Sequence, residues 1–209
     1  MILLSKVDAK LHPREEEGFS LAVVLALMAI LMIVIAGAAP NLRQQAQRER
    51  EAEAIFRGEQ MARAIQLYAR STGTLPTKID QLIEGVPRNG PQRLFILRSS
   101  AARDPLTTEG EWQPVAIGED ALLQFQQSLM LYTGGNAPTT RDPVIARYAV
   151  QMTNVVNLGS QRASSPFSGT SPLTGGPFIG VVSKSKNHSV MHFYGIEEHD
   201  DWIFTPLFR

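Results

Sequence analysis

The most prominent pattern along this chain is an uninterrupted apolar block close to the N-terminus. Residues 19–39, FSLAVVLALMAILMIVIAGAA, number 21 and include no charged side chain. A helix of that length spans about 30 Å, the thickness of the hydrocarbon core of a bilayer. A helix that is apolar on every face needs either lipid or a large protein core around it, and the rest of the chain is too small to supply such a core. The block therefore predicts a transmembrane helix.

A secretory signal peptide is the alternative interpretation of the same block. Such a peptide has a shorter apolar region followed by a cleavage site of small residues, and residues 36–39 could supply that site. The 18 residues before the block are polar and charged and end directly at Phe19. The transmembrane interpretation fits this arrangement better, and the signal peptide stays open.

A second helical pattern follows the apolar block over residues 41–70. This segment is rich in Gln, Arg, Glu and Ala, which are mostly good helix formers, and apolar or small residues recur at steps of three and four. These are Ala54, Gly58, Met61, Ile65 and Tyr68. The segment predicts an amphipathic helix in which these five residues form an apolar stripe that packs on a sheet. Residues 71–73, Ser-Thr-Gly, predict the end of the helix.

The remaining residues predict a mixed α+β domain. Residues 79–83 predict a short helix, and residues 121–132 predict a helix or an insertion because they contain few β-branched side chains. Residues 133–143 and 157–177 are rich in Gly, Pro, Ser and Thr and predict long loops. Runs at 177–183, 189–195 and 201–205 predict three strands of an antiparallel meander. The strand order within residues 84–209 is left open.

Composition and charge narrow the functional classes. The chain has 209 residues, with 20 basic and 20 acidic side chains and a formal net charge of zero, so it does not offer the basic surface typical of a nucleic-acid-binding protein. It contains no cysteine, which excludes disulfides, cysteine-ligated metals and a thiol nucleophile. Lys and Arg flank the apolar block about evenly, so charge alone does not fix the orientation of the helix.

No catalytic motif is present in the sequence. There is no G-x-S-x-G elbow and no phosphate-binding loop. The histidines lack acidic partners at the helical or hairpin spacing that would make a zinc site; they are His12, His188, His192 and His199. The one acidic cluster lies between the last two predicted strands and is interpreted as a solvated turn. Its members are Glu197, Glu198, Asp200 and Asp201. The chain is therefore expected not to be an enzyme.

The junction between leader and apolar block carries a family resemblance. The hexapeptide EEGFSL at residues 16–21 resembles the processing site of type IV prepilins and of type II secretion pseudopilins. The resemblance implies that a prepilin peptidase cuts after Gly18 and methylates the new N-terminal Phe19. It also implies that the apolar segment stays on the protein, as membrane anchor before assembly and as filament core afterwards.

Two further positions bear on this resemblance. Counted from Phe19, Pro40 occupies the place where the family has a proline, and it is expected to end or kink the helix near the membrane surface. Val23 stands where the family usually has a glutamate that pairs with the amine of a neighbouring subunit. Within the family, loss of this glutamate is typical of minor subunits at the filament tip, and the choice between major and minor subunit stays open.

The resemblance weakens further along the chain. Tyr68 followed by Gly73-Thr74-Leu75-Pro76 is similar to the end of the long helix in G-type pseudopilins. Asp104-Pro105 is present where the family has an Asp-Pro-Trp-Gly turn, but Leu106-Thr107 replaces the last two residues. G-type pseudopilins hold calcium in a C-terminal acidic loop, so the resemblance makes residues 197, 198, 200 and 201 weak calcium candidates. No other cofactor is expected.

The expected organisation is a leader at residues 1–18, a long helix at 19–70 with its transmembrane part at 19–39, and an α+β domain of pilin-like fold at 71–209. The resemblance implies a single-pass protein of the bacterial inner membrane that forms a pseudopilus or pilus-like filament. Its expected partners are the prepilin peptidase, other pilin-like subunits, the inner-membrane assembly platform and membrane lipid, with no nucleic acid. The alternatives are a membrane-tethered binding or sensory domain that is never cut, and a secreted enzyme released near Ala39.

Overall fold

The protein is an α+β chain with one long N-terminal helix and small antiparallel sheets. The structure, a computed structural model, describes residues 17–88, 92–136, 138–158 and 176–208. The chain divides into two compact units, Met1–Gln45 and Ala46–Arg209. The predicted leader at residues 1–18 therefore lies almost entirely outside the described residues.

Helix α1, Glu17–Thr72, runs through both predicted helical segments without interruption. It ends where the sequence predicts, because Gly73 takes a positive φ of 76° and donates its N–H to the carbonyl of Ala69 at 2.9 Å. A left-handed glycine after the last turn is a common helix stop. The expectation that Pro40 ends the helix is wrong: the proline removes one backbone donor, but the helix continues on both sides of it. A kink at Pro40 stays a prediction.

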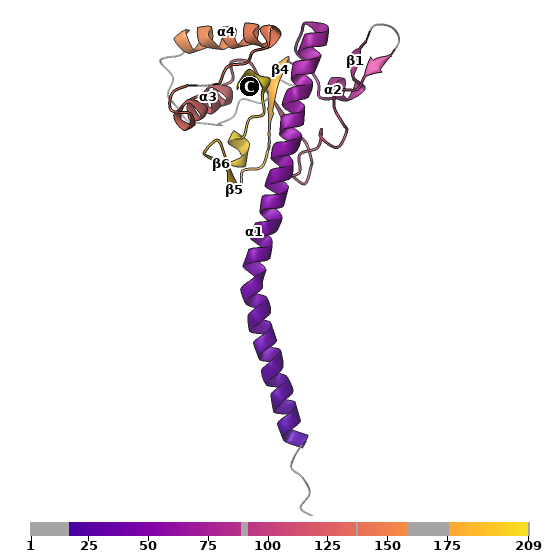
Figure 1. Ribbon diagram of the computed structural model, residues 1–209, viewed down its shortest axis with the longest axis vertical. Helices are drawn as coiled ribbons and strands as arrows, with labels where there is room; N and C mark the ends of the chain where they lie inside the picture. Colours follow the sequence, from indigo (N-terminus) through magenta and orange to yellow (C-terminus); the bar gives the residue numbers. More distant parts are fainter. Residues whose placement is uncertain (1–16, 89–91, 137, 159–175, 209) are drawn as a thin grey trace, which may run out of the picture. The chain divides into compact units, whose positions relative to one another are not determined.

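The second unit, Ala46–Arg209, builds its sheets from three separate antiparallel pairs of strands. Strand β1, Val86–Pro87, pairs with β2, Arg93–Leu94; β3, Gln113–Ala116, pairs with β4, Phe178–Val182; and β5, His188–Phe193, pairs with β6, Ile196–Glu198. Helix α2, Asp80–Glu84, leads into β1. In Figure 1, β1 and α2 lie on one side of α1, and β5 and β6 lie on the other.

The predicted meander of the last three strands is wrong. Strand β4 pairs along one edge with β3, about sixty residues earlier, rather than with β5. Its other edge meets the 201–205 segment through a single bridge, in which Val181 and Phe204 exchange N–H···O bonds of 3.0 and 2.9 Å. Residues 199–201 form a short 3-10 helix, η1, His199–Asp201, instead of starting a strand. All five residues of β4 are buried, so this strand forms the centre of the unit.

Two further helices lie on the same side of α1 as β4 in Figure 1. Helix α3, Asp120–Tyr132, confirms the helical option for that segment. Helix α4, Pro143–Leu158, was not predicted, because the Gly, Pro, Ser and Thr content of residues 133–143 predicts a loop and the residues directly after it carry no assigned element. Asp142 starts α4 by accepting the N–H of Val144 on Oδ1 at 2.9 Å, as an N-cap residue does, and Pro143 follows in the first turn.

The core joins the stripe of α1 to β4 and to the C-terminal segment. Four of the five predicted stripe residues are buried, and Tyr68 is partly buried. The indole of Trp112 is edge-on to Phe204, with 5.7 Å between ring centroids, and it donates Nε1–H to the carbonyl of Ala101. The largest fully buried side chains are Trp202, Phe178, Phe204, Met61, Ile65, Leu82, Leu122, Leu129, Ile145, Ile179, Ile203 and Leu207.

Gly58 marks a close approach of α1 to the C-terminal segment. A Cβ atom at this position would overlap the ring of Phe204. We expect Gly58→Ala to lower the free energy of unfolding by about 1–3 kcal/mol through overpacking, although alanine is the better helix former. Denaturant titration followed by the fluorescence of Trp112 and Trp202 measures this. Gly37→Ala is the control, since no atom lies within 4 Å of a Cβ there; equal stability of the two variants would contradict the packing described.

Candidate functional site

The apolar half of α1 presents its side chains outward throughout the described part. The large apolar residues from Leu21 to Ile35 are 41–72% exposed. By length and composition this is the one helix, among the described residues, that could cross a membrane, and none of its apolar window is buried within the chain. An apolar surface of this extent is unstable in water. Lipid or other apolar helices around the segment would remove this surface from water.

The predicted processing residues lie at the start of this helix. Gly18 and Phe19 are within its first turn, and Val23 follows one turn later on its exposed surface. Pro40 lies within the helix. Cleavage and methylation at Gly18-Phe19 stay predictions.

A buried polar cluster joins α1 to the C-terminal part of the second unit. The Glu51 carboxylate, fully buried, accepts the backbone N–H groups of Val190 at 2.9 Å and Met191 at 2.7 Å. It also accepts Nε2–H of Gln47 at 2.8 Å, and it lies 3.0 Å from Nε2 of His199. Val190 and Met191 belong to β5 and His199 belongs to η1, whereas Gln47 belongs to α1 itself. Glu51 therefore fixes the helix against the C-terminal part of the chain.

The cluster extends from His199 through the loop after β4. Nδ1 of His199 lies 3.2 Å from Oγ of Ser185. The N–H of Ser185 donates to Oγ of Ser183, whose hydroxyl donates to Oδ2 of Asp104 at 2.6 Å. Asp104 also accepts the N–H of Leu106 on Oδ1 at 2.9 Å, which is the turn chemistry expected of Asp104-Pro105.

The electrostatics of Glu51 favour its charged form. Burial works to raise the pKa of this carboxyl, but the donors that converge on it outweigh burial and hold the pKa below its ordinary value. Glutamate, histidine and serine in hydrogen-bonded sequence are also the residue types of a nucleophilic triad. Here all three side chains are buried, so the Ser185 hydroxyl is closed to a substrate in this conformation. The arrangement can stabilise the fold by hydrogen bonding.

A second buried carboxylate, Asp142, connects the end of α1 to α4. Its Oδ2 accepts from Arg70 and from Nε2 of Gln66, the latter at 3.1 Å, while its Oδ1 caps α4. Burial works to raise the pKa of Asp142, and the hydrogen bonds from Arg70, Val144 and Gln66 outweigh burial and lower it. Together, Glu51 and Asp142 attach both ends of the helix stripe to the rest of the unit.

The lowered pKa of Asp142 leads to a prediction about pH. A carboxyl with a depressed folded-state pKa contributes stability above its unfolded value, here 3.8, and loses it as the pH falls through the folded value. Asp142→Asn keeps an N-cap residue but removes the charge, so we expect a loss of about 1.5–3 kcal/mol at neutral pH. The difference from wild type should shrink as the pH falls below 3.8. Urea titrations of both proteins at several pH values measure it, and a constant difference would contradict the assignment.

The predicted acidic cluster is partly assembled. Carboxylate oxygens of Glu198, Asp200 and Asp201 lie within 4.8 Å of one another, whereas Glu197 is not part of this group. Oδ1 of Asp200 is buried without a hydrogen-bond partner. Burial, with the charge of Glu198 adding to it, raises the pKa of Asp200. Burial, with the charges of Asp200 and Glu198 adding to it, also raises the pKa of Asp201.

These three carboxylates are the residues that could hold a hard cation such as calcium, which prefers several oxygen ligands. Calcium usually takes six to eight oxygens, and exposed acidic groups also cluster without a metal. The donor set alone therefore does not assign a metal site. A cluster of like charges with one unpartnered oxygen does favour a positively charged neighbour.

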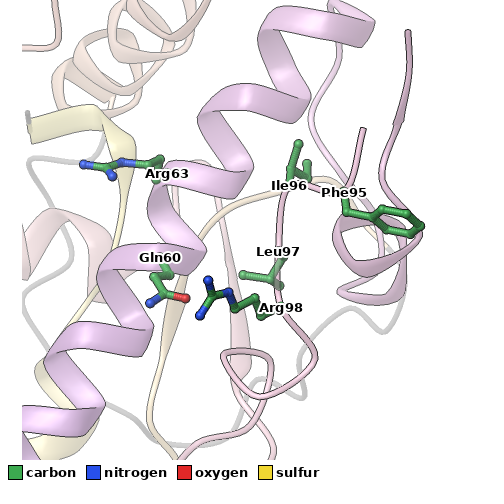
Figure 2. Close-up of a pocket in the computed structure, with 6 residues that line it drawn as sticks. All are labelled: Gln60, Arg63, Phe95, Ile96, Leu97 and Arg98. Atoms are coloured by element: carbon green, nitrogen blue, oxygen red, sulfur yellow. The ribbon is translucent and has the colours of Figure 1, made fainter. Parts of the chain in front are cut away.

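A shallow hollow of about 350 Å³ lies between α1 and the segment after β2 (Figure 2). Its lining residues are Gln60, Arg63, Phe95, Ile96, Leu97 and Arg98. In Figure 2, Arg98 extends toward Gln60 of α1, and Phe95 points away from the helix. The hollow is too open and too poor in convergent polar groups to resemble an enzyme pocket.

Sequence reasoning did not identify Glu51, Ser185 or His199 as a cluster. No acidic residue lies at helical or hairpin spacing from His199 in the sequence, and the partner that the structure gives it, Glu51, is 148 residues away. One signal was present: Glu51 precedes Ala54 by three residues, so it continues the apolar stripe of α1. Comparison of this chain with protein-family models, with curated proteins and with solved structures found no match.

Proposed function

We propose that this chain is a structural subunit of a membrane-anchored filament of the pilin or type II pseudopilin kind. The observation that carries the proposal is the single helix α1, which is apolar and exposed at its N-terminal half and amphipathic and packed into a folded unit at the other. No break separates the two halves. A helix of this kind suits a role in which one half is held by lipid or by neighbouring helices while the other supports a domain.

The N-terminal motif supports the same proposal. Cleavage after Gly18 would remove the charged leader and leave Phe19 as an apolar first residue directly before the span. Without the leader, the helix can leave the bilayer and enter a filament core without moving charged side chains through hydrocarbon, which costs about 2.5–3.5 kcal/mol each at the centre. The prepilin peptidase, other pilin-like subunits and an inner-membrane assembly platform are the partners that the resemblance implies.

Val23 bears on the position of the subunit in the filament. An apolar side chain at this place avoids the cost of a buried carboxylate and gives up an ion pair with a neighbour's amine. A subunit at the filament tip has no subunit above it that would need this pair. Val23 is therefore compatible with a position at the tip, and the choice between a major and a minor subunit stays open.

The second candidate function is a membrane-tethered domain that does not assemble. The buried clusters around Glu51 and Asp142 would serve such a domain equally well, since they stabilise a single copy. The two functions differ in whether the apolar helices of separate copies contact each other in the membrane.

Cross-linking through the apolar helix distinguishes these functions. The chain has no native cysteine, so Leu27→Cys places one thiol on the exposed apolar surface. In native membranes treated with a membrane-permeable oxidant, filament assembly predicts disulfide-linked dimers. Asp120→Cys, on an exposed residue of α3, controls for random collision. Dimers of neither variant, or of both equally, would contradict assembly through the helix.

A further inference from the structure

Two exposed tyrosines meet at the C-terminal end of α3. Tyr132, the last residue of α3, is 64% exposed, and Tyr194, in the turn between β5 and β6, is 37% exposed. Their rings stand at 78° to each other, with 5.8 Å between the centroids. Leu131 is 85% exposed, more than any other large apolar side chain that the structure describes. We call Leu131, Tyr132 and Tyr194 the tyrosine corner.

The rings around Tyr194 fix its position. Tyr194 has a φ of 54° and is the one residue other than glycine, among the described residues, with a positive φ. This backbone conformation is unfavourable for a bulky side chain, and asparagine or glycine is usual in a two-residue hairpin turn of this kind. The ring of Tyr194 contacts those of Phe193 and Phe125, with centroid distances of 4.5 and 6.2 Å. These contacts hold the ring against Tyr132, at a place where turn geometry alone would favour a different residue.

The elements that form the tyrosine corner and those next to it are acidic. Helix α3, strands β5 and β6 and η1 contain no lysine or arginine. Their carboxylates are those of Asp120, Glu197, Glu198, Asp200 and Asp201. Lys186, in the loop before β5, interacts with Asp200, which leaves an excess of negative charge on these elements. The C-terminal end of α3 adds the negative end of the helix dipole at Tyr132, so the electrostatic field at the corner favours a cation.

The chemistry of the corner matches one kind of cation in particular. The face of an aromatic ring attracts cations, and arginine is found over such rings more often than lysine. The flat guanidinium of arginine stacks on a tyrosine ring, and its methylene stem can cover an apolar side chain such as Leu131. Arginine and aromatic residues are also the types enriched where proteins meet. Ring geometry, apolar exposure and charge therefore all favour an arginine as the ligand.

We propose that the tyrosine corner is a docking site for an arginine of a partner protein, whose guanidinium stacks on a ring of the corner while its stem lies on Leu131. The carboxylates of the surrounding elements attract a basic partner during approach. The apolar side chains of the corner then exclude water, which strengthens the attraction between the guanidinium and the ring. The inference goes beyond the proposed function, because a filament subunit and a tethered domain would present the same corner.

Fluorine NMR of the full chain in a non-ionic detergent tests this site. The chain has four tyrosines, so incorporation of fluorotyrosine gives four signals. Tyr68 and Tyr148 are partly buried against the core, and their signals serve as internal controls. The probes are N-acetyl-arginine amide and N-acetyl-citrulline amide, which have nearly the same shape but differ in charge. We expect the signals of Tyr132 and Tyr194 to report binding of the arginine probe about two- to five-fold tighter than that of the citrulline probe.

Three variants separate the rings from the rest of the corner. Tyr132→Leu keeps an apolar side chain but removes a ring, so it should abolish the preference for the arginine probe. Leu131→Ala keeps both rings, so it should weaken the binding of both probes and leave the preference in place. Tyr194→Asn also removes a ring, and asparagine suits the left-handed turn, so a lost preference in this variant does not come from a strained backbone.

Three results would overturn the docking site. Equal binding of the two probes would show an apolar surface with no preference for charge. Shifts of Tyr68 and Tyr148 as large as those of Tyr132 and Tyr194 would show that the arginine probe binds without a defined site. Choline is the third probe: tighter binding of choline than of the arginine probe would assign the corner to a quaternary ammonium group, such as that of a lipid headgroup, and contradict a protein arginine as its ligand.

Discussion

Replacing Glu51 with alanine should lower the free energy of unfolding of the second unit by about 3–5 kcal/mol, the range found when one partner of a buried ionic cluster is removed. The variant leaves the N–H groups of Val190 and Met191 and Nε2 of His199 without their acceptor in a buried site. An unsatisfied buried donor costs about 1–3 kcal/mol, so several of them together give a large effect. Denaturant titration of the full chain in detergent, followed by tryptophan fluorescence, measures the loss.

Two further variants make this prediction specific. Glu53→Ala removes an exposed carboxylate of the same helix, which pairs with Arg57 at 2.7 Å, and should cost no more than about 0.5 kcal/mol. Glu51→Gln keeps the shape and one acceptor oxygen, and should fall between the two. A loss for Glu51→Ala as small as that for Glu53→Ala would show that the cluster does not hold α1 to the C-terminal segment.

Two arginines introduced into the middle of the apolar helix should release the protein from membranes. Each arginine near the centre of a bilayer costs about 2.5–3.5 kcal/mol, so Leu27→Arg combined with Leu31→Arg costs about 5–7 kcal/mol in total. Both positions are exposed and lie one turn apart, so the two charges share one face and cannot be hidden in the chain's own core. Extraction of membranes with alkaline carbonate measures the fraction that stays with the lipid.

The matched control places the same charges further along the same helix. Ala46 and Ala52 are exposed positions of α1 outside the apolar block, and Ala46→Arg combined with Ala52→Arg should leave membrane retention unchanged. Equal retention of all three proteins would contradict the assignment of residues 19–39 as the span.

The helical half of this fold was predictable because its signals are local. The apolar block, the stripe of α1 and the stop at Gly73 depend on neighbouring residues only, and the structure has α1 end at Thr72. The start of helix α4 could also have been predicted from the sequence. Asp142 followed by Pro143 is an N-cap residue with proline in the first turn, but the surrounding Gly, Pro and Thr residues led to a loop assignment.

The sheets were less predictable because their pairing is not local. The β-branched run at residues 178–182 predicts a strand, but nothing in it indicates that its partner is Gln113–Ala116. The segment 201–205 has a strand-like composition, yet it makes only one bridge, between Val181 and Phe204. Which segments pair as strands depends on tertiary packing, here on the burial of Phe204 against Gly58.

The candidate sites likewise differ in whether their residues are close together in the sequence. The acidic cluster was visible as a run of carboxylates, although the structure leaves Glu197 outside the assembled group. The contact of Glu51 with His199 joins residues 148 apart, so no spacing rule could find it. A charged residue at an apolar stripe position is a signal that could have indicated a buried partner for Glu51.

The proposal that this chain is processed as a pilin-like subunit is tested most directly by the mass of its N-terminal peptide from native membranes. Processing by a prepilin peptidase predicts a chain that begins at Phe19, carries one methyl group on its amine and lacks residues 1–18. A chain that begins at Met1 in the membrane would contradict processing and leave a tethered domain, and one that begins near Pro40 in the medium would contradict the anchor itself.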